Sequence, residues 1–390
     1  MNYILFDSLS WNDLKPLTFT RPIAELRCGI LTIREKWNLY LKTECSYKTQ
    51  AYLQQKFPLH LQNNNVYINA QCLPNASLIA EIRALDINSV LMQNDTVIAL
   101  ACTGEFPENV DNFTHIQTKS ECAQILFPWH IFLLNTSEIE SDFELLTKGR
   151  TSQVLSETNR VIAPHNIFVE KGASVECATL NAQTGKMYIG ANAQIMEGAL
   201  IRGPFALCEH SSIKMGAKIY EGTTIGPHSK VGGEVQNSVI FGYSNKGHDG
   251  YLGNSVIGEW CNLGADTNNS NLKNDYSEVK VWNYTTQRFK KTGLQFCGLI
   301  MGDYSKSAIN TMFNTGTVVG VSANVFGAGF PRNFTPSFSW GGPHGLDVYP
   351  LAKSVATAQR VFERRGKIFS QIDNDILAYI FAETEQFRRF

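Results

Sequence analysis

The sequence has no strong charge imbalance, no long apolar run and no ordered cysteine pattern. Its 34 basic and 35 acidic residues give a formal net charge of −1, which argues against bulk attraction to nucleic acid or to an anionic membrane. No apolar run reaches the roughly 18 residues that a membrane span needs. The N-terminus has no basic segment that leads into an apolar run, so we expect no signal peptide.

The nine cysteines form neither CxxC pairs nor a zinc-ligand spacing. Their odd number and scattered positions predict reduced thiols rather than a disulfide framework. We therefore expect the protein to lie in a reducing compartment, the cytoplasm. The 390 residues are enough for two or three domains with a sizeable core.

A six-residue period organises the middle of the chain. Aliphatic residues recur at every sixth position from Ile189 to Val231, and small residues recur at the fourth position after most of them. This period matches neither an α-helix nor a simple alternating strand. It predicts a β-solenoid, in which aliphatic side chains stack inside and small residues fill the corners. The period resumes at Leu252 and again between Met301 and Gly329.

Three regions follow from this pattern. Residues 1–150 have no hexads and read as an α/β domain, 151–330 as the solenoid, and 331–390 as a proline-rich loop with a helical tail. In the first region we expect buried strands and helices in alternation, with strands at 3–6, 65–68 and 96–100 and helices at 23–41, 78–85 and 131–135. For the tail we expect loop over 330–350 and helix over 351–387.

Two segments interrupt the hexads, one after Val231 and one over residues 268–292. Function is expected where a repeat is broken, because an unbroken solenoid gains nothing from an interruption. The segment 245–271 offers His248 as a group able to accept a proton near neutral pH, with Lys246 as a cation. The alternative is that His248 is an ordinary surface residue and that the asparagines only support tight corners.

The residues from Lys246 to Asn271 carry a specific resemblance. The stretch Lys246-Gly-His-Asp-Gly-Tyr-Leu-Gly253, followed by Ile257-Gly, Asn262-Leu-Gly-Ala and Asn271, resembles the acetyltransferase half of the bifunctional N-acetylglucosamine-1-phosphate uridylyltransferase/glucosamine-1-phosphate acetyltransferase family. The resemblance implies a left-handed parallel β-helix, a homotrimer, and acetyl-CoA or another acyl-CoA bound between neighbouring solenoids.

The same resemblance assigns roles to individual residues. His248 corresponds to the general base that takes a proton from the sugar amine, and Tyr251, Asn262 and Asn271 correspond to residues that position the acceptor. Further correspondences are to cofactor-binding and substrate-binding positions, namely Ala265, Lys246 and Lys280 for the acyl donor and Arg202 for the sugar phosphate. The position after Asn271 holds leucine instead of the family's tyrosine. The family's basic residues that hold the sugar phosphate have no clear match, with Arg202 upstream and Lys273 or Lys280 beyond Asn271 as candidates, so the acceptor can differ.

The N-terminal stretch Leu14-Lys-Pro-Leu-Thr-Phe-Thr-Arg-Pro22 resembles the start of sugar-1-phosphate nucleotidyltransferases. That resemblance implies a Rossmann-like domain that binds a sugar phosphate or nucleotide, with Arg21 and Arg27 as candidate contacts. The loop over residues 7–13 has no glycine to cradle phosphates, and the strand at 66–68 runs into Asn69 instead of a metal-binding aspartate. Because Mg²⁺ needs anionic oxygen ligands, the sequence argues against nucleotidyl transfer, and Mg²⁺ is expected only if this domain is active.

The leading hypothesis is therefore an enzyme of sugar-nucleotide metabolism that transfers an acyl group, most simply acetyl, to an amino sugar or its phosphate. One alternative is a working sugar-1-phosphate nucleotidyltransferase whose solenoid trimerises it. Another is a non-catalytic protein that binds a sugar nucleotide. The predicted partners are small sugar phosphates or nucleotide sugars and two further copies of the chain, with neither nucleic acid nor membrane.

Overall fold

The computed structural model describes all 390 residues and resolves them into two compact units. The first unit comprises residues 1–14, 20–26 and 31–127. The second comprises residues 15–19, 27–30 and 128–390. The helix expected over residues 131–135 runs from Pro128 to Thr147 and belongs to the second unit, so the boundary expected at residue 150 lies near Pro128 instead.

The first unit is built on a mixed sheet of six strands in the order β2-β1-β3-β5-β4-β6. Strand β1 is parallel to β2 and β3, whereas β5 runs antiparallel to both β3 and β4. Its strands and helices are β1 (Asn2–Phe6), α1 (Ser10–Asp13), η1 (Ile23–Glu25), α2 (Ile33–Leu41), β2 (Ser46–Lys48), β3 (Asn64–Asn69), α3 (Ala76–Arg83), β4 (Ser89–Gln93), β5 (Thr96–Thr103) and β6 (Thr114–Gln117). The predicted α/β layer is confirmed, with an antiparallel strand in its middle.

The continuous helix expected over residues 23–41 is wrong. A single 3₁₀ turn is followed by extended chain, and α2 begins only at Ile33, where the Thr32 side chain and Glu35 form a reciprocal capping box. Gly29 has a φ of +83°. The Gly29 and Ile30 amides donate to side chains of the long helix α4 (Pro128–Thr147), Asn135 at 2.7 Å and Asp142 at 2.8 Å, instead of to helical carbonyls.

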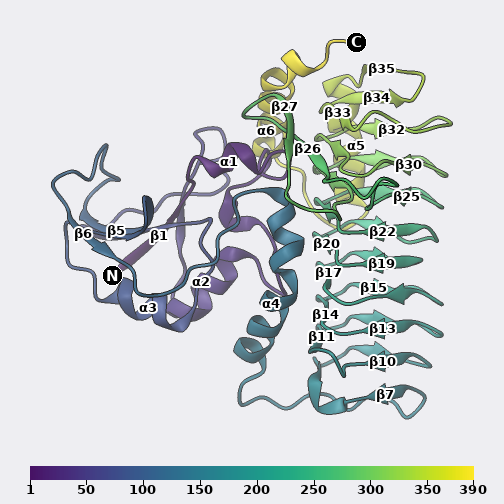
Figure 1. Cartoon of the computed structure of the whole chain (residues 1–390), viewed down its shortest axis with the longest axis horizontal. Coiled ribbons are helices and arrows are strands. Elements are labelled where there is room, and N and C mark those ends of the chain that lie inside the picture. The colour runs from purple at the N-terminus through teal and green to yellow at the C-terminus, as the bar shows by residue number, and fades with distance from the viewer. The chain divides into compact units, whose positions relative to one another are not determined.

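The second unit contains the predicted β-solenoid, whose coils stack from β7 to β35 in Figure 1. Its strands fall into three sheets that are parallel apart from one terminal hairpin. The first sheet contains β7 (Arg160–Ile162), β10 (Thr179–Asn181), β13 (Leu200–Arg202), β16 (Lys218–Ile219), β19 (Glu234–Gln236) and β22 (Tyr251–Gly253). The second contains β8 (Ile167–Val169), β11 (Met187–Ile189), β14 (Phe205–Leu207), β17 (Thr223–Ile225), β20 (Val239–Ile240), β23 (Val256–Ile257), β28 (Ile300–Met301), β31 (Val318–Val319) and β33 (Phe334–Thr335).

The third sheet forms one wall of the site described below. It contains β9 (Ser174–Val175), β12 (Gln194–Ile195), β15 (Ser212–Ile213), β18 (Lys230–Val231), β21 (Asn245–Lys246), β24 (Asn262–Leu263), β29 (Lys306–Ser307), β32 (Asn324–Val325), β34 (Ser339–Gly342) and β35 (Gly345–Val348). Each two-residue strand from β9 to β32 places its second residue in the inner row of the coil. The inner row is Val175, Ile195, Ile213, Val231, Lys246, Leu263, Ser307 and Val325.

The hexad aliphatics are buried inside the solenoid, as predicted. Ile189, Ile213, Ile225 and Val231 have no exposed surface. The coils turn tightly because one residue at many corners adopts a positive φ, and several of these residues are not glycine, for example His228 at +57° and Trp260 at +61°. The spacing of the aliphatics therefore reports the fold correctly, because only stacked short strands bury every sixth residue.

The segment after Val231 is not an interruption of the coil. Strands β21 and β22 continue the ladders of the third and first sheets without a gap. Ser212 pairs with Lys230, 18 residues later, whereas Lys230 pairs with Asn245, only 15 residues later. The break in the hexads thus comes from a shortened corner at Gly232–Gly233, which lies under the loop that carries His248.

A true excursion lies further along the chain. Strand β25 (Asn268–Asn269) pairs with β30 (Met312–Phe313), and between them the chain forms the antiparallel hairpin of β26 (Lys280–Asn283) and β27 (Arg288–Lys291). This agrees with the excursion predicted over residues 268–292.

The loop expected over residues 330–350 is wrong, because β33 and β34 form a last coil and β34 turns back into β35. The four prolines of this region lie outside these strands, where a missing N–H costs no ladder bond. The helical tail is confirmed, but it is divided into α5 (Leu351–Glu363) and α6 (Gln371–Glu383), followed by η3 (Glu385–Phe387). Gly366, with a φ of +64°, lies in the break.

None of the helices is both long and apolar enough to pass through a bilayer.

Candidate functional site

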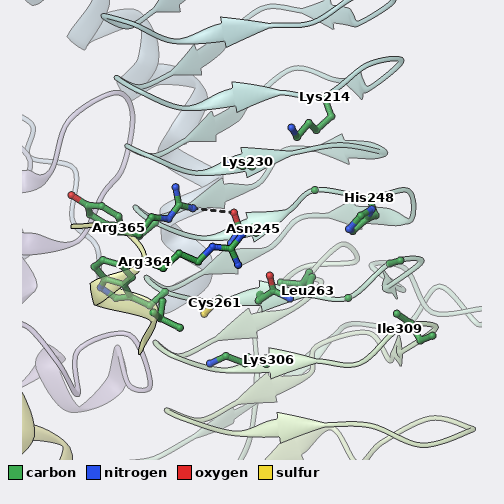
Figure 2. Close-up of a pocket in the computed structure, with 17 residues that line it drawn as sticks. Lys214, Lys230, Asn245, His248, Cys261, Leu263, Lys306, Ile309, Arg364 and Arg365 are labelled. Atoms are coloured by element: carbon green, nitrogen blue, oxygen red, sulfur yellow. Dashed lines mark hydrogen bonds between the residues drawn. The ribbon is translucent and has the colours of Figure 1, made fainter. Parts of the chain in front are cut away.

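A cleft of about 720 Å³ runs across the outer side of the third sheet and is bounded by helix α5. Its wall is the outer row of four successive strands, which register pairing places side by side: Lys230, Asn245, Asn262 and Lys306. Figure 2 shows His248 towards one end of this cleft and Arg364 and Arg365 towards the other. The cleft lies wholly within the second unit.

The cleft is strongly basic. Five cationic side chains line it and no aspartate or glutamate does, the five being Lys214, Lys230, Lys306, Arg364 and Arg365. Burial is the main cause that lowers the pKa of Lys230 and Arg365, and neighbouring cations lower both further. Arg365 donates to the Asn245 side chain at 3.3 Å, as Figure 2 shows. Cations that depress one another's pKa favour an anionic ligand between them.

A ladder of stacked rings fixes helix α5 against the solenoid. His210, His228, Tyr243 and Trp260 occupy equivalent corners of four coils, and Phe362 of α5 completes the ladder. The ring centroids are 4.9, 4.7, 4.1 and 4.1 Å apart along this series, with near-parallel planes. Because Phe362 is adjacent in sequence to Val361 and close to Arg364, the ladder sets where the basic end of the cleft lies.

His248 lies on the exposed corner loop that follows β21 and lines the cleft. The loop is held by backbone bonds on both sides, since Asp266 N–H donates to the Asp249 carbonyl at 3.0 Å and Glu234 N–H donates to the Gly250 carbonyl at 3.2 Å. Asn262 and Ala265, two other predicted residues, line the same cleft. The imidazole is therefore open to a ligand, and the chain around it is fixed.

Tyr251 and Asn271 lie together, but not among the residues that line the cleft. The Asn271 amide donates to the Tyr251 hydroxyl at 2.9 Å and to the Asn254 side chain at 2.8 Å. Tyr251 in turn donates to Gln236 at 3.1 Å. Burial raises the pKa of the Tyr251 hydroxyl, and the Asn271 bond opposes this. The predicted quartet is thus divided: His248 and Asn262 line the cleft, whereas Tyr251 and Asn271 bond to each other outside its lining.

The remaining predicted solenoid residues lie elsewhere. The Lys246 side chain points into the core and is 2% exposed, so it does not line the cleft. Lys280 lies on β26 and lines a separate cavity of about 600 Å³ with Lys273 and Arg332. Arg202 is exposed on β13 of the first sheet, three strands from Tyr251 on β22, or roughly 14 Å at the usual strand spacing. Their assigned roles stay predictions.

The two N-terminal arginines also lie apart. Arg27 belongs to the second unit, where its buried guanidinium donates to the Ile30 carbonyl and lies 3.8 Å from the Cys208 sulfur. Arg21 belongs to the first unit and is buried there, with its carbonyl 3.4 Å from the Trp11 indole nitrogen. Neither arginine is exposed, so a contact with a phosphate would require movement.

The polar residues at the strand ends of the first unit bond to one another. Ser8 and Ser10 both donate to the Gln71 side-chain oxygen, at 2.6 and 2.8 Å, and Gln71 donates to Gln124 at 2.9 Å. Asp7 accepts from the Ile23 amide at 2.8 Å and the Thr49 hydroxyl at 2.5 Å.

Burial raises the pKa of Asp7 to about 7, against the two hydrogen bonds that oppose it. One carboxyl that is easily protonated, among amides and hydroxyls, is a poor donor set for Mg²⁺. These residues do not fit the metal that nucleotidyl transfer would need.

The sequence analysis predicted neither the five cations of the cleft nor the ring ladder. The ladder had a readable signal, because His210 and His228 are 18 residues apart, one full coil, and Tyr243 and Trp260 continue the series at the shortened spacing. Arg364 and Arg365 gave no such signal, since their place in the cleft depends on where α5 packs.

Comparisons with known proteins agree with both predicted resemblances. Residues 3–151 match the sugar nucleotidyl transferase family. The chain is 36% identical over 118 residues to the bifunctional protein GlmU of Methanocaldococcus jannaschii, covering 30% of this chain and 26% of that protein. It is 33% identical over 144 residues to a bifunctional sugar-1-phosphate nucleotidylyltransferase/acetyltransferase of Sulfurisphaera tokodaii, covering 36% of this chain and 35% of that one.

An uncharacterised acetyltransferase of Escherichia coli, YaiX, is 29% identical over 142 residues, which is 36% of this chain and 61% of the relative. The chain therefore matches less than two thirds of the length of each of these relatives. Among solved structures, the UDP-N-acetylglucosamine acyltransferase of Francisella novicida aligns with 59% of this chain and 88% of its own at 13% identity. Its TM-score of 0.27 is too low to support any argument.

Proposed function

We propose that the solenoid transfers an acyl group from a CoA thioester to the amine of an amino sugar or amino-sugar phosphate, with His248 as the general base. The observation that carries this proposal is the cleft itself, in which an exposed imidazole and five unopposed cations line one cavity. The relatives named as acetyltransferases support the same reaction class, and the sugar nucleotidyl transferase match of residues 3–151 supports a sugar phosphate or nucleotide sugar as substrate.

The residues fit an acyl-CoA. The phosphates of CoA are anions, and Lys230, Arg364 and Arg365 offer charge-assisted hydrogen bonds to them at one end of the cleft. The rings of Tyr243 and Trp260 line the same cavity, although their faces are already stacked in the ladder. A thioester bound by its phosphates at this end would extend along the outer row towards His248.

In this reaction the role of His248 is to accept a proton from the acceptor amine. An ammonium has no lone pair to attack a thioester, so the acceptor reacts as the neutral amine. His248 takes the proton that the nitrogen loses as the C–N bond forms and the C–S bond breaks, and the departing thiolate takes a proton back from the imidazolium to leave as the thiol. Within the cleft, Asn262 supplies a neutral amide near the same loop for orienting the acceptor. We assign Tyr251 and Asn271 to the acceptor side, since they form a preorganised pair one strand past the His248 loop.

We further propose a homotrimer in which a neighbouring solenoid completes the site. The His248 ring is exposed and makes no hydrogen bond within its own chain, although a general base is normally oriented by a partner group. For the first unit we propose binding of a sugar phosphate or nucleotide sugar without nucleotidyl transfer. The nine cysteines, none of them in a disulfide and eight of them buried, fit the cytoplasm as the compartment.

The test measures free thiol released from acetyl-CoA in the presence of a panel of amino sugars and amino-sugar 1-phosphates. We expect release that depends on one acceptor class. A parallel assay measures pyrophosphate from nucleoside triphosphate, sugar 1-phosphate and Mg²⁺, where we expect none above the rate without protein. Pyrophosphate release without thiol release would favour the nucleotidyltransferase alternative. Tight binding of a nucleotide sugar without either activity would favour the non-catalytic one.

A further inference from the structure

One residue of the inner row carries a charge, whereas the others are aliphatic or, at Ser307, a small hydroxyl. The inner row of the third sheet is aliphatic from Val175 to Val231, and at the next coil the equivalent position is Lys246. Its side chain is 2% exposed, between Val231 on one coil and Leu263 on the next. An ammonium in such a position loses its water, so aliphatic side chains are normally found there.

The buried amine is held by two carbonyls. Lys246 Nζ donates to the His248 carbonyl at 2.8 Å and to the Gly232 carbonyl at 3.1 Å. The first bond fixes the loop that carries the imidazole, and the second ties that loop to the shortened corner of the previous coil. The amine therefore bridges two successive coils beneath His248, which no aliphatic side chain could do.

The backbone next to the Lys246 amine leaves room for it because position 233 is a glycine. Gly233 has a φ of +72°, and a Cβ there would lie 2.8 Å from Lys246 Nζ and 2.7 Å from the Gly250 carbonyl oxygen. The 15-residue spacing between Lys230 and Asn245 brings this corner close to the loop. The shortened coil, Gly233 and the buried Lys246 side chain thus all lie against the loop that carries His248.

We infer that Lys246 is a positioning residue, whose amine holds the His248 loop at the mouth of the cleft and thereby aims the imidazole at the acceptor. This inference rests on the proposed role of His248, because only that role gives the loop a reason to be fixed. It replaces the direct contact with the acyl donor expected from the sequence, since a side chain sealed in the core cannot reach a ligand. A misplacement of about 1 Å in a reacting group lowers a rate on the order of 100-fold.

The test compares Lys246→Met with the wild type and with Ile213→Met as a matched control. Methionine has nearly the length of lysine and suits an aliphatic row, so both variants should fold. Ile213 lies in the same row, two coils before Lys246, and is not among the residues that line the cleft. Thermal unfolding checks that both variants keep the fold.

The structural readout is hydrogen exchange of the Glu234 and Asp266 amides, which donate to the loop carbonyls of Gly250 and Asp249. We expect exchange at these two amides to become at least about 10-fold faster in Lys246→Met, because the loop that protects them is released. The Gln194 amide, which donates to Ser211 O in a distant coil, should be unchanged. Ile213→Met should leave all three amides as in the wild type.

The catalytic readout is thiol release. We expect Lys246→Met to lower kcat on the order of 100-fold with little change in KM for acetyl-CoA, since the amine aims a base and binds no substrate. Wild-type protection of Glu234 and Asp266 in a folded Lys246→Met variant would overturn the inference. If the loop loosens but the wild type releases no thiol, Lys246 holds the loop and the proposed acyl transfer fails, so the two failures are distinguishable.

Discussion

The two units treat their polar side chains in opposite ways. At the strand ends of the first unit, hydroxyls, amides and the Asp7 carboxyl bond to one another. In the cleft of the second unit, five cations face one cavity without a carboxylate among the lining residues. Polar groups that hydrogen-bond to one another need no ligand, whereas cations that repel one another are stabilised by an anionic ligand. The comparison supports the proposed location of the chemistry on the solenoid.

A large effect on ligand binding is expected from the cleft cations. Replacing Arg364 and Arg365 together by glutamate should weaken CoA binding about 100-fold, since two charge-assisted contacts contribute roughly 1.5 kcal/mol each. Titration calorimetry measures the Kd, and wild-type binding should weaken with added salt. The control is Arg160→Glu with Lys171→Glu, two exposed residues of the first coils that change the net charge equally. Equal CoA binding by both double variants would show that Arg364 and Arg365 do not bind CoA.

Asp7 provides the next test. Its pKa is raised from 3.8 to about 7, so the folded state holds its proton more tightly than the unfolded state does. The stabilisation is full below about pH 4 and is lost as the pH rises towards 7. Relative to Asp7→Asn, the wild type should lose about 3 kcal/mol of unfolding free energy across this range. Urea unfolding at pH 4, 5.5 and 7 measures it, and a difference independent of pH would show an ionised carboxylate.

For Lys246 we expect the opposite change of stability with pH. Burial lowers the pKa of its ammonium from 10.5 to about 8, although the nearby Asp249 and Asp266 carboxylates oppose this. Between pH 8 and 10.5 the unfolded chain binds more protons, so stability rises with pH there. The wild type should gain about 2 kcal/mol relative to Lys246→Met over this window. Denaturant midpoints of the two proteins at pH 7.5, 9 and 10 measure this gain. A stability difference that stays constant over this range would mean that the amine is not desolvated.

The smallest effect is expected at the ring ladder. Phe362→Ala removes the ring that stacks on Trp260 at 4.1 Å and meets Phe369 edge-on at 5.3 Å. Undocking of α5 should become easier by about 2 kcal/mol, from lost burial and stacking. Limited proteolysis near residues 364–367 reports it, and Phe330→Ala, at a ring that is 56% exposed, is the control. Cleavage at the same rate in both variants would show that the ladder does not hold α5.

The sequence predicted the solenoid because its spacing has a single physical cause. A residue at every sixth position is buried only if short strands stack in coils, so the hexads from Ile189 to Val231 specify both the fold and the inward side chains. The same regularity misled after Val231, where the break in the pattern was interpreted as an interruption of the solenoid. The cause is a shorter corner at Gly232–Gly233, which moves the corner without breaking the ladder.

The site was predicted only in part. His248, Asn262 and Ala265 line one cleft because they lie at fixed places on successive coils. Arg364 and Arg365 could not be found in the same way, since they reach the cleft through the packing of Phe362 on Trp260, a contact 102 residues apart in the chain. The failed helix at 23–41 has the same origin, because Asn135 and Asp142 bind the Gly29 and Ile30 amides that a helix would have used.

The most direct test is the rate of thiol release by His248→Gln beside the wild type, at saturating acetyl-CoA with the best acceptor found. Glutamine keeps a hydrogen-bonding side chain on the loop but cannot take up a proton near neutral pH. Because general bases contribute about 10²- to 10⁴-fold, we predict a loss of kcat in that range with unchanged CoA affinity. A His248→Gln protein that releases thiol as fast as the wild type would contradict the assignment of the base and, with it, the proposed mechanism.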